Sequence, residues 1–213
     1  MRNFFVLIGT VLALAIPASA QPVLIELFSS HNCPASQEAH GTLKQVAAER
    51  DDVLVLTWSV DYWDYLGEPD PMAIQMSTIR QEAYIDRFGL RGPYTPQTVY
   101  NGAQECQGNK PEDIAHWLGE LGGVSHPGVA IRQTVHGWTV DVPAGLDADV
   151  HVVSFLSAGD NTTGMVNPVT GMDTLAHLKH GGAVGLSQSC ASACALLVQA
   201  SGHGVIYSAQ QIQ

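Results

Sequence analysis

The chain contains few charged residues, and positively charged ones are the scarcest. Of 213 residues only 9 are Lys or Arg, against 20 Asp or Glu, which gives a formal net charge of −11 at pH 7. Nucleic acids and anionic lipid surfaces are bound through clustered Lys and Arg, so this composition argues against both as partners. Hydrophobic residues still make up 46% of the chain, which is enough to bury a sizeable core and argues against disorder.

Long apolar runs are also rare, and the one that exists lies at the start. Residues 4–16 are almost wholly apolar, follow Arg2, and precede the small residues of 17–20. This arrangement is typical of a secretory signal peptide cleaved after Ala20, and the run is shorter than the ~20 residues that a spanning helix needs. We therefore expect a periplasmic or secreted protein that makes no membrane contact after signal cleavage.

Cysteine occurs only four times, at Cys33, Cys106, Cys190 and Cys194. Export would place these residues in an oxidising compartment. Four cysteines allow three disulfide pairings, and the sequence alone does not choose among them. No motif for a nucleotide, haem or zinc site is present, so we expect no cofactor and no resident metal.

The first half of the chain alternates strand and helix patterns. The patterns predict, in order, a strand at 22–28, a helix at 34–49, a strand at 53–60, a helix at 72–88, strands at 97–100 and 103–107, and a helix at 111–121. Asn101-Gly102, between the last two strands, is a strong two-residue hairpin signal. This order predicts an α/β layer with a mixed sheet.

The second half has a different texture, in which short strand patterns dominate. They predict strands at 129–135, 138–142, 150–156, 194–200 and 205–209, with a weak helix signal at 172–179. We therefore expect a small β-rich subdomain that packs on the first half.

Cys33 and Pro96 are the residues on which a chemical interpretation depends. Cys33 follows the first strand and stands at the start of the first helix, where unpaired N–H groups and the helix dipole favour a thiolate. Thr95-Pro96 opens the strand after the second helix, and an X-Pro bond is where a cis peptide is least costly. This order resembles the thioredoxin fold, in which a reactive cysteine faces a cis-proline.

The expected fold class is therefore α/β, a thioredoxin-like fold with a C-terminal β-rich extension. The expected organisation is a signal peptide at 1–20, a thioredoxin-like domain at 21–122 and a β-rich subdomain at 123–213.

Four segments are distinctive enough to indicate a family. They are residues 26–30 (ELFSS), 59–67 (SVDYWDYLG), 80–84 (RQEAY) and 92–102 (GPYTPQTVYNG). Together they resemble the bacterial secreted thioredoxin-like family catalogued as domain of unknown function 1223. The resemblance implies the fold and export, and it implies no settled activity.

One departure from that family changes the expected chemistry. Family members usually carry Cys-x-x-Cys where this chain reads Cys33-Pro-Ala-Ser36, and a hydroxyl cannot form a disulfide. We therefore expect a monothiol route, in which Cys33 forms mixed disulfides with protein or small-molecule thiols. Ser36 would donate a hydrogen bond to the thiolate, and His31 would act as a charge partner or proton carrier.

A second cysteine is a candidate to resolve such a mixed disulfide. The turn at Asn101-Gly102 returns Cys106 to the same end of the sheet as Cys33. A disulfide needs Cα atoms within roughly 7 Å, which this topology does not guarantee. The alternative is that Cys106 is a buried, inert thiol.

Two further features keep other functions open. Tyr62 and Trp63 either wall a substrate groove beside Cys33 or simply cap the sheet, and in the first case the protein could bind ligands without catalysis. Cys190 and Cys194 either form a local disulfide or hold copper(I), which soft thiolates select. The possible third copper ligands are His177, His180 and His203.

Overall fold

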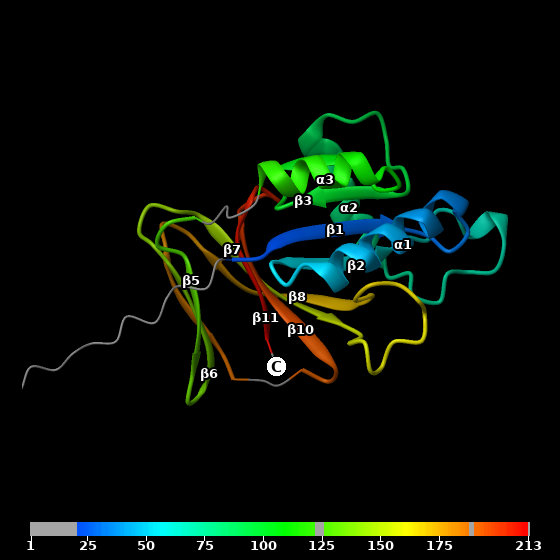
Figure 1. Cartoon of the computed structure of the whole chain (residues 1–213). Coiled ribbons are helices and arrows are strands. Elements are labelled where there is room, and N and C mark those ends of the chain that lie inside the picture. The colour runs from blue at the N-terminus through cyan, green and yellow to red at the C-terminus, as the bar shows by residue number, and fades with distance from the viewer. Residues whose placement is uncertain (1–20, 122–125, 188–189, 213) are drawn as a thin grey trace, which may run out of the picture.

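The computed structural model of this chain describes residues 21–121, 126–187 and 190–212. The signal peptide predicted at 1–20 and the domain boundary predicted at 122–123 lie outside the described residues. The described residues form a mixed α/β structure with three sheets and three α-helices (Figure 1). No helix among them is long and apolar enough to cross a membrane.

The first sheet carries the N-terminal half and has the strand order β2-β1-β3-β4. Its strands are β1 (Val23–Ser29), β2 (Val53–Ser59), β3 (Gln97–Tyr100) and β4 (Gln104–Gln107). β1 and β2 are parallel, whereas β3 is antiparallel to both β1 and β4. The helices are α1 (Pro34–Glu49), α2 (Gln75–Phe88) and α3 (Pro111–Glu120). The mixed sheet expected from the sequence is therefore present.

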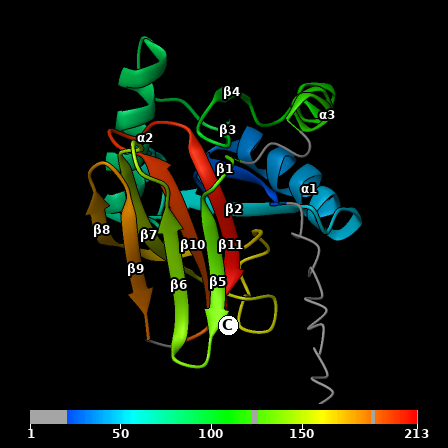
Figure 2. The same cartoon turned by 90° about the vertical axis from the view of Figure 1, so that its left-hand side faces the viewer.

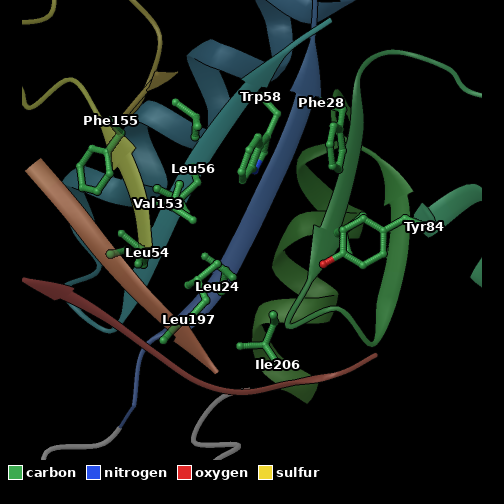
Figure 3. Packing of buried hydrophobic residues seen from close by; sticks show 14 of the residues in the cluster. Leu24, Phe28, Leu54, Leu56, Trp58, Tyr84, Val153, Phe155, Leu197 and Ile206 are labelled. Carbon is green, nitrogen blue, oxygen red and sulfur yellow. The ribbon is translucent and has the colours of Figure 1, made fainter. Parts of the chain in front are cut away.

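The two faces of this sheet have different neighbours, because side chains alternate along each strand. Ile25 and Leu27 of β1 pack with apolar residues of α1 and α3. Leu24 and Phe28, which point the other way, pack with Tyr84 of α2 and with strands of the second half. Figure 3 shows side chains of β1 and β2 meeting those of β7 and β10 in this shared core.

The second half consists of two antiparallel sheets that lie face to face (Figure 2). One has the order β11-β10-β7-β8 and the other β5-β6-β9. The strands are β5 (Ala130–Thr134), β6 (Gly137–Val142), β7 (Ala148–Phe155), β8 (Val169–Leu178), β9 (Gly182–Leu186), β10 (Ala193–Ala200) and β11 (Ile206–Ile212). β10 is buried on both faces, because Leu197 faces the first core while Leu196 and Val198 face the third sheet.

The helix predicted at 172–179 is wrong, because residues 172–178 belong to β8, which pairs with β7. The apolar residues Met172, Leu175 and Leu178 have the three-residue spacing of a helix. The ladder shifts register between Val150 and His151, and this bulge leaves Leu175 without a partner. Met172 therefore faces the core shared with the first sheet, whereas Leu175 and Leu178 face the core between the two sheets of the second half. A bulge breaks the two-residue alternation on which strand recognition depends. The short strand β9 was not predicted either.

A buried ionic network joins the two halves. The Arg80 guanidinium on α2 donates to both carboxylate oxygens of Glu26 on β1, at 2.5 and 2.9 Å, and both residues are fully buried. Tyr84 donates to the same carboxylate at 2.6 Å, and Arg80 also reaches Gln199 on β10 at 3.2 Å. One carboxylate of the first sheet is thus linked through α2 to the second sheet.

The predicted hairpin turn also connects the two halves of the molecule. Asn101 and Gly102 have φ angles of 47° and 59°, which is the left-handed geometry that Asn-Gly favours. The Asn101 carbonyl accepts the N–H of Ile206 on β11 at 2.7 Å, and its side chain accepts the N–H of Leu24 at 2.7 Å. A Cβ at Gly102 would lie 2.6 Å from the Gly204 carbonyl oxygen, so only glycine fits this close approach.

Candidate functional site

Cys33 is the N-cap residue of α1, directly after the loop that leaves β1. Pro34 occupies the first turn, and the Cys33 carbonyl accepts the Ser36 N–H at 3.0 Å. The thiol donates to the Thr95 carbonyl oxygen, with sulfur and oxygen 3.5 Å apart. The Thr95–Pro96 peptide bond is cis. Cys33, Thr95 and Pro96, which the sequence nominates together, therefore lie at one place in the fold.

The surroundings of Cys33 favour its thiolate. Burial raises the pKa of the thiol, since the residue is only 8% exposed. Hydrogen bonds from the side chains of Ser36 and Thr95 and from the backbone N–H groups of Ala35 and Ser36 act in the opposite direction and prevail. The pKa of Cys33 consequently lies below the ordinary value for a cysteine.

Ser36 itself is fully buried one turn into α1. Besides its interaction with Cys33, its hydroxyl accepts the Ser30 N–H at 3.4 Å. It therefore stabilises both the loop that presents the cysteine and the charged form of the sulfur.

Trp63 is connected to the site through Thr95. Its indole N–H donates to the Thr95 hydroxyl oxygen at 2.8 Å. Because that oxygen accepts a bond from Trp63, the hydroxyl proton remains available to the Cys33 sulfur. Trp63 also stacks on Tyr65 with ring centroids 6.1 Å apart. Burial raises the pKa of the neighbouring Tyr62, and the charge of Cys33 adds to this effect, so the phenol stays protonated.

His31 interacts with a carboxylate that sequence reasoning missed. Asp70 is buried and accepts the backbone N–H groups of His31 and Met72, each at 2.9 Å. The His31 ring nitrogen Nδ1 lies 3.7 Å from an oxygen of the same carboxylate. The His31 ring therefore faces the carboxylate of Asp70, which is distant in sequence, and its predicted role toward the Cys33 thiolate stays a prediction.

His40 is a second residue that the sequence did not single out. It lies on α1 one turn after Ser36, and its spacing of seven residues from Cys33 puts it on the same helix face. The side chain is buried, and neither ring nitrogen has a hydrogen-bond partner among the described residues. Burial lowers the pKa of His40, with the Asp70 charge acting in the opposite direction. The signal in the sequence that could have identified His40 is its helical spacing from Cys33.

Cys106 does not contact Cys33. It lies on the edge strand β4 opposite Thr98, and its sulfur lies 3.4 Å from the Thr98 hydroxyl and 3.7 Å from that of Tyr100. β3 separates its strand from β1, and both thiols are free. Burial raises the pKa of Cys106. The structure thus places Cys106 on the edge strand of the first sheet and Cys33 at the N-cap of α1, and no disulfide joins the two.

Cys190 and Cys194 form a disulfide, with Cα atoms 5.9 Å apart. The histidines considered with them lie elsewhere. Cys194 pairs with Ser154 across the β7–β10 ladder, whereas His177 pairs with Asp149, five residues further along β7. At about 3.4 Å per residue this is roughly 17 Å.

The other two histidines lie near the same far end of the sheet. The His180 N–H bonds to Asp147, and His203 lies in the turn after β10. Within the described ranges no three His, Cys, Asp or Glu side chains are grouped as metal ligands would be.

Comparisons with known proteins match the chain to one family model and to two solved structures. A family model described as "Protein of unknown function (DUF1223)" matches residues 24–167. The crystal structure of protein AGR_C_4864 from Agrobacterium tumefaciens is 27% identical, with a TM-score of 0.73 over 92% of this chain and 95% of that one. HBP35 of Porphyromonas gingivalis is 12% identical, with a TM-score of 0.50 over 92% of this chain and 76% of that one, and this likeness concerns the fold alone. No curated protein matches.

Proposed function

The chain belongs to the DUF1223 family of proteins of unknown function, and on that premise we propose that it is an exported, thioredoxin-like protein that exchanges disulfides through the single thiol of Cys33. Its partners would be protein or small-molecule thiols.

The arrangement around the first sheet supports the thioredoxin-like part of this proposal. A parallel β1-α1-β2 unit is followed by α2, the antiparallel β3–β4 hairpin and α3. Cys33 lies at the start of α1, and Pro96 directly precedes β3. A helix N-terminus is a favourable place for a thiolate, because its free N–H groups and its dipole stabilise negative charge.

The observation that carries the proposal is the set of donors around the Cys33 sulfur. Two side-chain hydroxyls and two backbone N–H groups lower the pKa of a thiol whose burial alone would raise it. The thiolate is the species that attacks disulfides, so a lowered pKa increases the reactive fraction near neutral pH.

The exchange proceeds in two steps. The Cys33 thiolate attacks one sulfur of a disulfide R–S–S–R′. A bond forms between the Cys33 sulfur and the sulfur of R, and the original S–S bond breaks. R′S⁻ leaves and takes a proton from water. A second thiol, R″SH, then loses its proton and attacks the sulfur of R, which releases the Cys33 thiolate and the new disulfide R–S–S–R″. No electrons are gained or lost overall.

The second thiol must come from outside the site. Ser36 stands where a resolving cysteine would be, and the Cys106 sulfur is engaged with Thr98 and Tyr100. The rate of the second step should therefore depend on the concentration of added thiol.

Alkylation of Cys33 as a function of pH tests the proposal. In a Cys106→Ser variant Cys33 is the one free thiol, because Cys190 and Cys194 are paired. Iodoacetamide should modify it with an apparent pKa below the ordinary value, and glutathione disulfide should add one glutathione, located on Cys33 by mass spectrometry. The Cys33→Ser/Cys106→Ser double variant is the control and should gain neither. A Cys33 that stays unmodified at about pH 8 in the folded protein, yet reacts once unfolded, would refute thiol exchange.

The exposed aromatic loop favours a second candidate function. Tyr65 and Leu66, next to Trp63, are 76% and 56% exposed, and exposed apolar side chains often mark interaction sites. In this alternative the protein binds a ligand beside Cys33 without exchange. A ligand that binds the Cys33→Ser variant as tightly as the wild type, but not a Tyr65→Ser variant, would support it.

A further inference from the structure

The Cys190–Cys194 disulfide lies in the second half of the molecule and joins the loop before β10 to the start of that strand. It lines a cavity of about 320 Å³ together with Val152, Ser154, Asp173, Leu186 and Ala191. A disulfide that borders an open cavity is accessible to a small molecule, and this one is not used by the exchange proposed for Cys33.

The disulfide is not needed to hold the sheet together. It closes a loop with a sequence separation of only four residues, and such short loops gain less from a cross-link than long ones do. Cys194 is already fixed by its strand, which pairs with Ser154 on β7 and Ile212 on β11. A purely architectural role therefore gives a weak account of this pair.

The two sulfurs differ in their surroundings. Cys190 is half-buried in a loop whose next residues, Ala191 and Ser192, are exposed. Cys194 is 2% exposed, and its sulfur lies 3.8 Å from the Ser154 hydroxyl. An incoming thiolate can thus approach the Cys190 sulfur more easily, while the Ser154 hydroxyl can donate to a Cys194 thiolate as it leaves.

We propose that the Cys190–Cys194 disulfide is a second thiol-exchange centre, which oxidises small thiols that carry no negative charge. A thiolate forms a bond to the Cys190 sulfur, the Cys190–Cys194 bond breaks, and Cys194 leaves as a thiolate that takes a proton from water. A second small thiolate then attacks the sulfur of the bound small thiol, the bond from that sulfur to Cys190 breaks, and Cys190 leaves as a thiolate that takes a proton from water. Two thiols are oxidised to one small disulfide, and the protein disulfide is reduced to two thiols.

The preference for thiols without negative charge follows from the residues that line the cavity. Asp173 is exposed on β8 and contributes a carboxylate to the cavity, in a chain whose formal net charge is −11. A negatively charged thiol is repelled there, and a positively charged one is attracted. One unit charge about 8 Å away in water changes the approach rate by roughly 2.4-fold in each direction, so thiols of opposite charge should differ by about sixfold.

Reduction rates with three thiols test this inference. The protein is a full-length Cys33→Ser/Cys106→Ser variant, so the result does not depend on the function proposed for Cys33. Cysteamine, 2-mercaptoethanol and 3-mercaptopropionate are compared at equal thiolate concentration, and released protein thiols are trapped with a maleimide and counted by mass spectrometry. We expect rates that decrease in that order, in proportion to thiol concentration, with the small thiol in a mixed disulfide on Cys190 and the maleimide on Cys194.

Two further variants distinguish the effect of the carboxylate in the cavity from the effect of the protein's overall charge. Asp173→Asn should narrow the difference between cysteamine and mercaptopropionate, whereas Glu112→Gln, on the exposed surface of α3, should leave it unchanged. Equal rates for all three thiols, or a mixed disulfide of the small thiol with Cys194, would overturn the proposal. A rate independent of thiol concentration would also overturn it, because opening of the fold would then limit the reaction.

Discussion

His151 should make the stability of this protein decrease in mild acid. The residue lies on β7, is 5% exposed, and its ring nitrogen Nδ1 is 3.0 Å from the Thr174 hydroxyl. Burial, with a further contribution from the Arg80 guanidinium, lowers the pKa of His151 to about 4 from its ordinary value of 6.5. The folded state therefore holds a neutral imidazole that the unfolded chain would protonate.

The sign and size of the effect follow from linkage. Because the folded pKa is depressed, the stabilisation is fully present above pH 6.5, decreases below it, and is lost as the pH falls through 4. One pKa unit corresponds to 1.36 kcal/mol, so the full effect is about 3 kcal/mol, of which about 2 kcal/mol is lost by pH 5. This is a large fraction of the 5–15 kcal/mol that typically stabilises a domain.

Urea denaturation of the wild type and of His151→Gln, at about pH 7.5 and pH 5, measures this directly. Glutamine can keep a hydrogen bond to Thr174 and has no titrating group, so the variant should lose about 2 kcal/mol less free energy of unfolding between the two pH values. His177→Gln is the matched control, because that imidazole lies on the adjacent strand and its side chain is 69% exposed. Equal losses in the wild type and in His151→Gln would refute the reasoning.

Three further predictions concern the buried network, the joint between the halves and the thiol. Arg80→Met leaves Glu26 buried without its counter-charge and should cost about 3–5 kcal/mol in urea denaturation, part of which Glu26→Gln in the same chain should restore. Gly102→Ala places a Cβ 2.6 Å from a backbone oxygen at positive φ and should cost about 1–3 kcal/mol, whereas Gly119→Ala, in open space on α3, should not destabilise. Ser36→Ala removes a donor to the Cys33 thiolate and should shift the alkylation of Cys33 to higher pH without abolishing it.

The parts of the fold that could be predicted from the sequence are those that local chemistry determines. Asn101-Gly102 gives a tight turn because both residues tolerate positive φ. Pro34 begins α1 because a proline has no N–H to satisfy in a first turn. The uninterrupted apolar run of β10 is consistent with a strand buried on both faces, and it has cores on both sides.

What could not be predicted depends on residues that are distant along the chain. His31 meets Asp70 across 39 positions, and Arg80 reaches Gln199 across 119; no local pattern carries such pairings. β8 was missed for a related reason, since a bulge opposite His151 interrupts the alternation of its side chains. Its partner strand, which lies elsewhere in the sequence, determines where that interruption falls.

Serine rather than cysteine at position 36 has two separable consequences for the chemistry proposed for Cys33. A neighbouring cysteine can do two things for a reactive thiol, because it can donate a hydrogen bond to the thiolate and can later break the mixed disulfide. The buried hydroxyl of Ser36 retains the first and eliminates the second. Cys33 would then form mixed disulfides readily and lose them slowly. On this argument, the lifetime of the mixed disulfide is set by the outside thiol rather than by the protein.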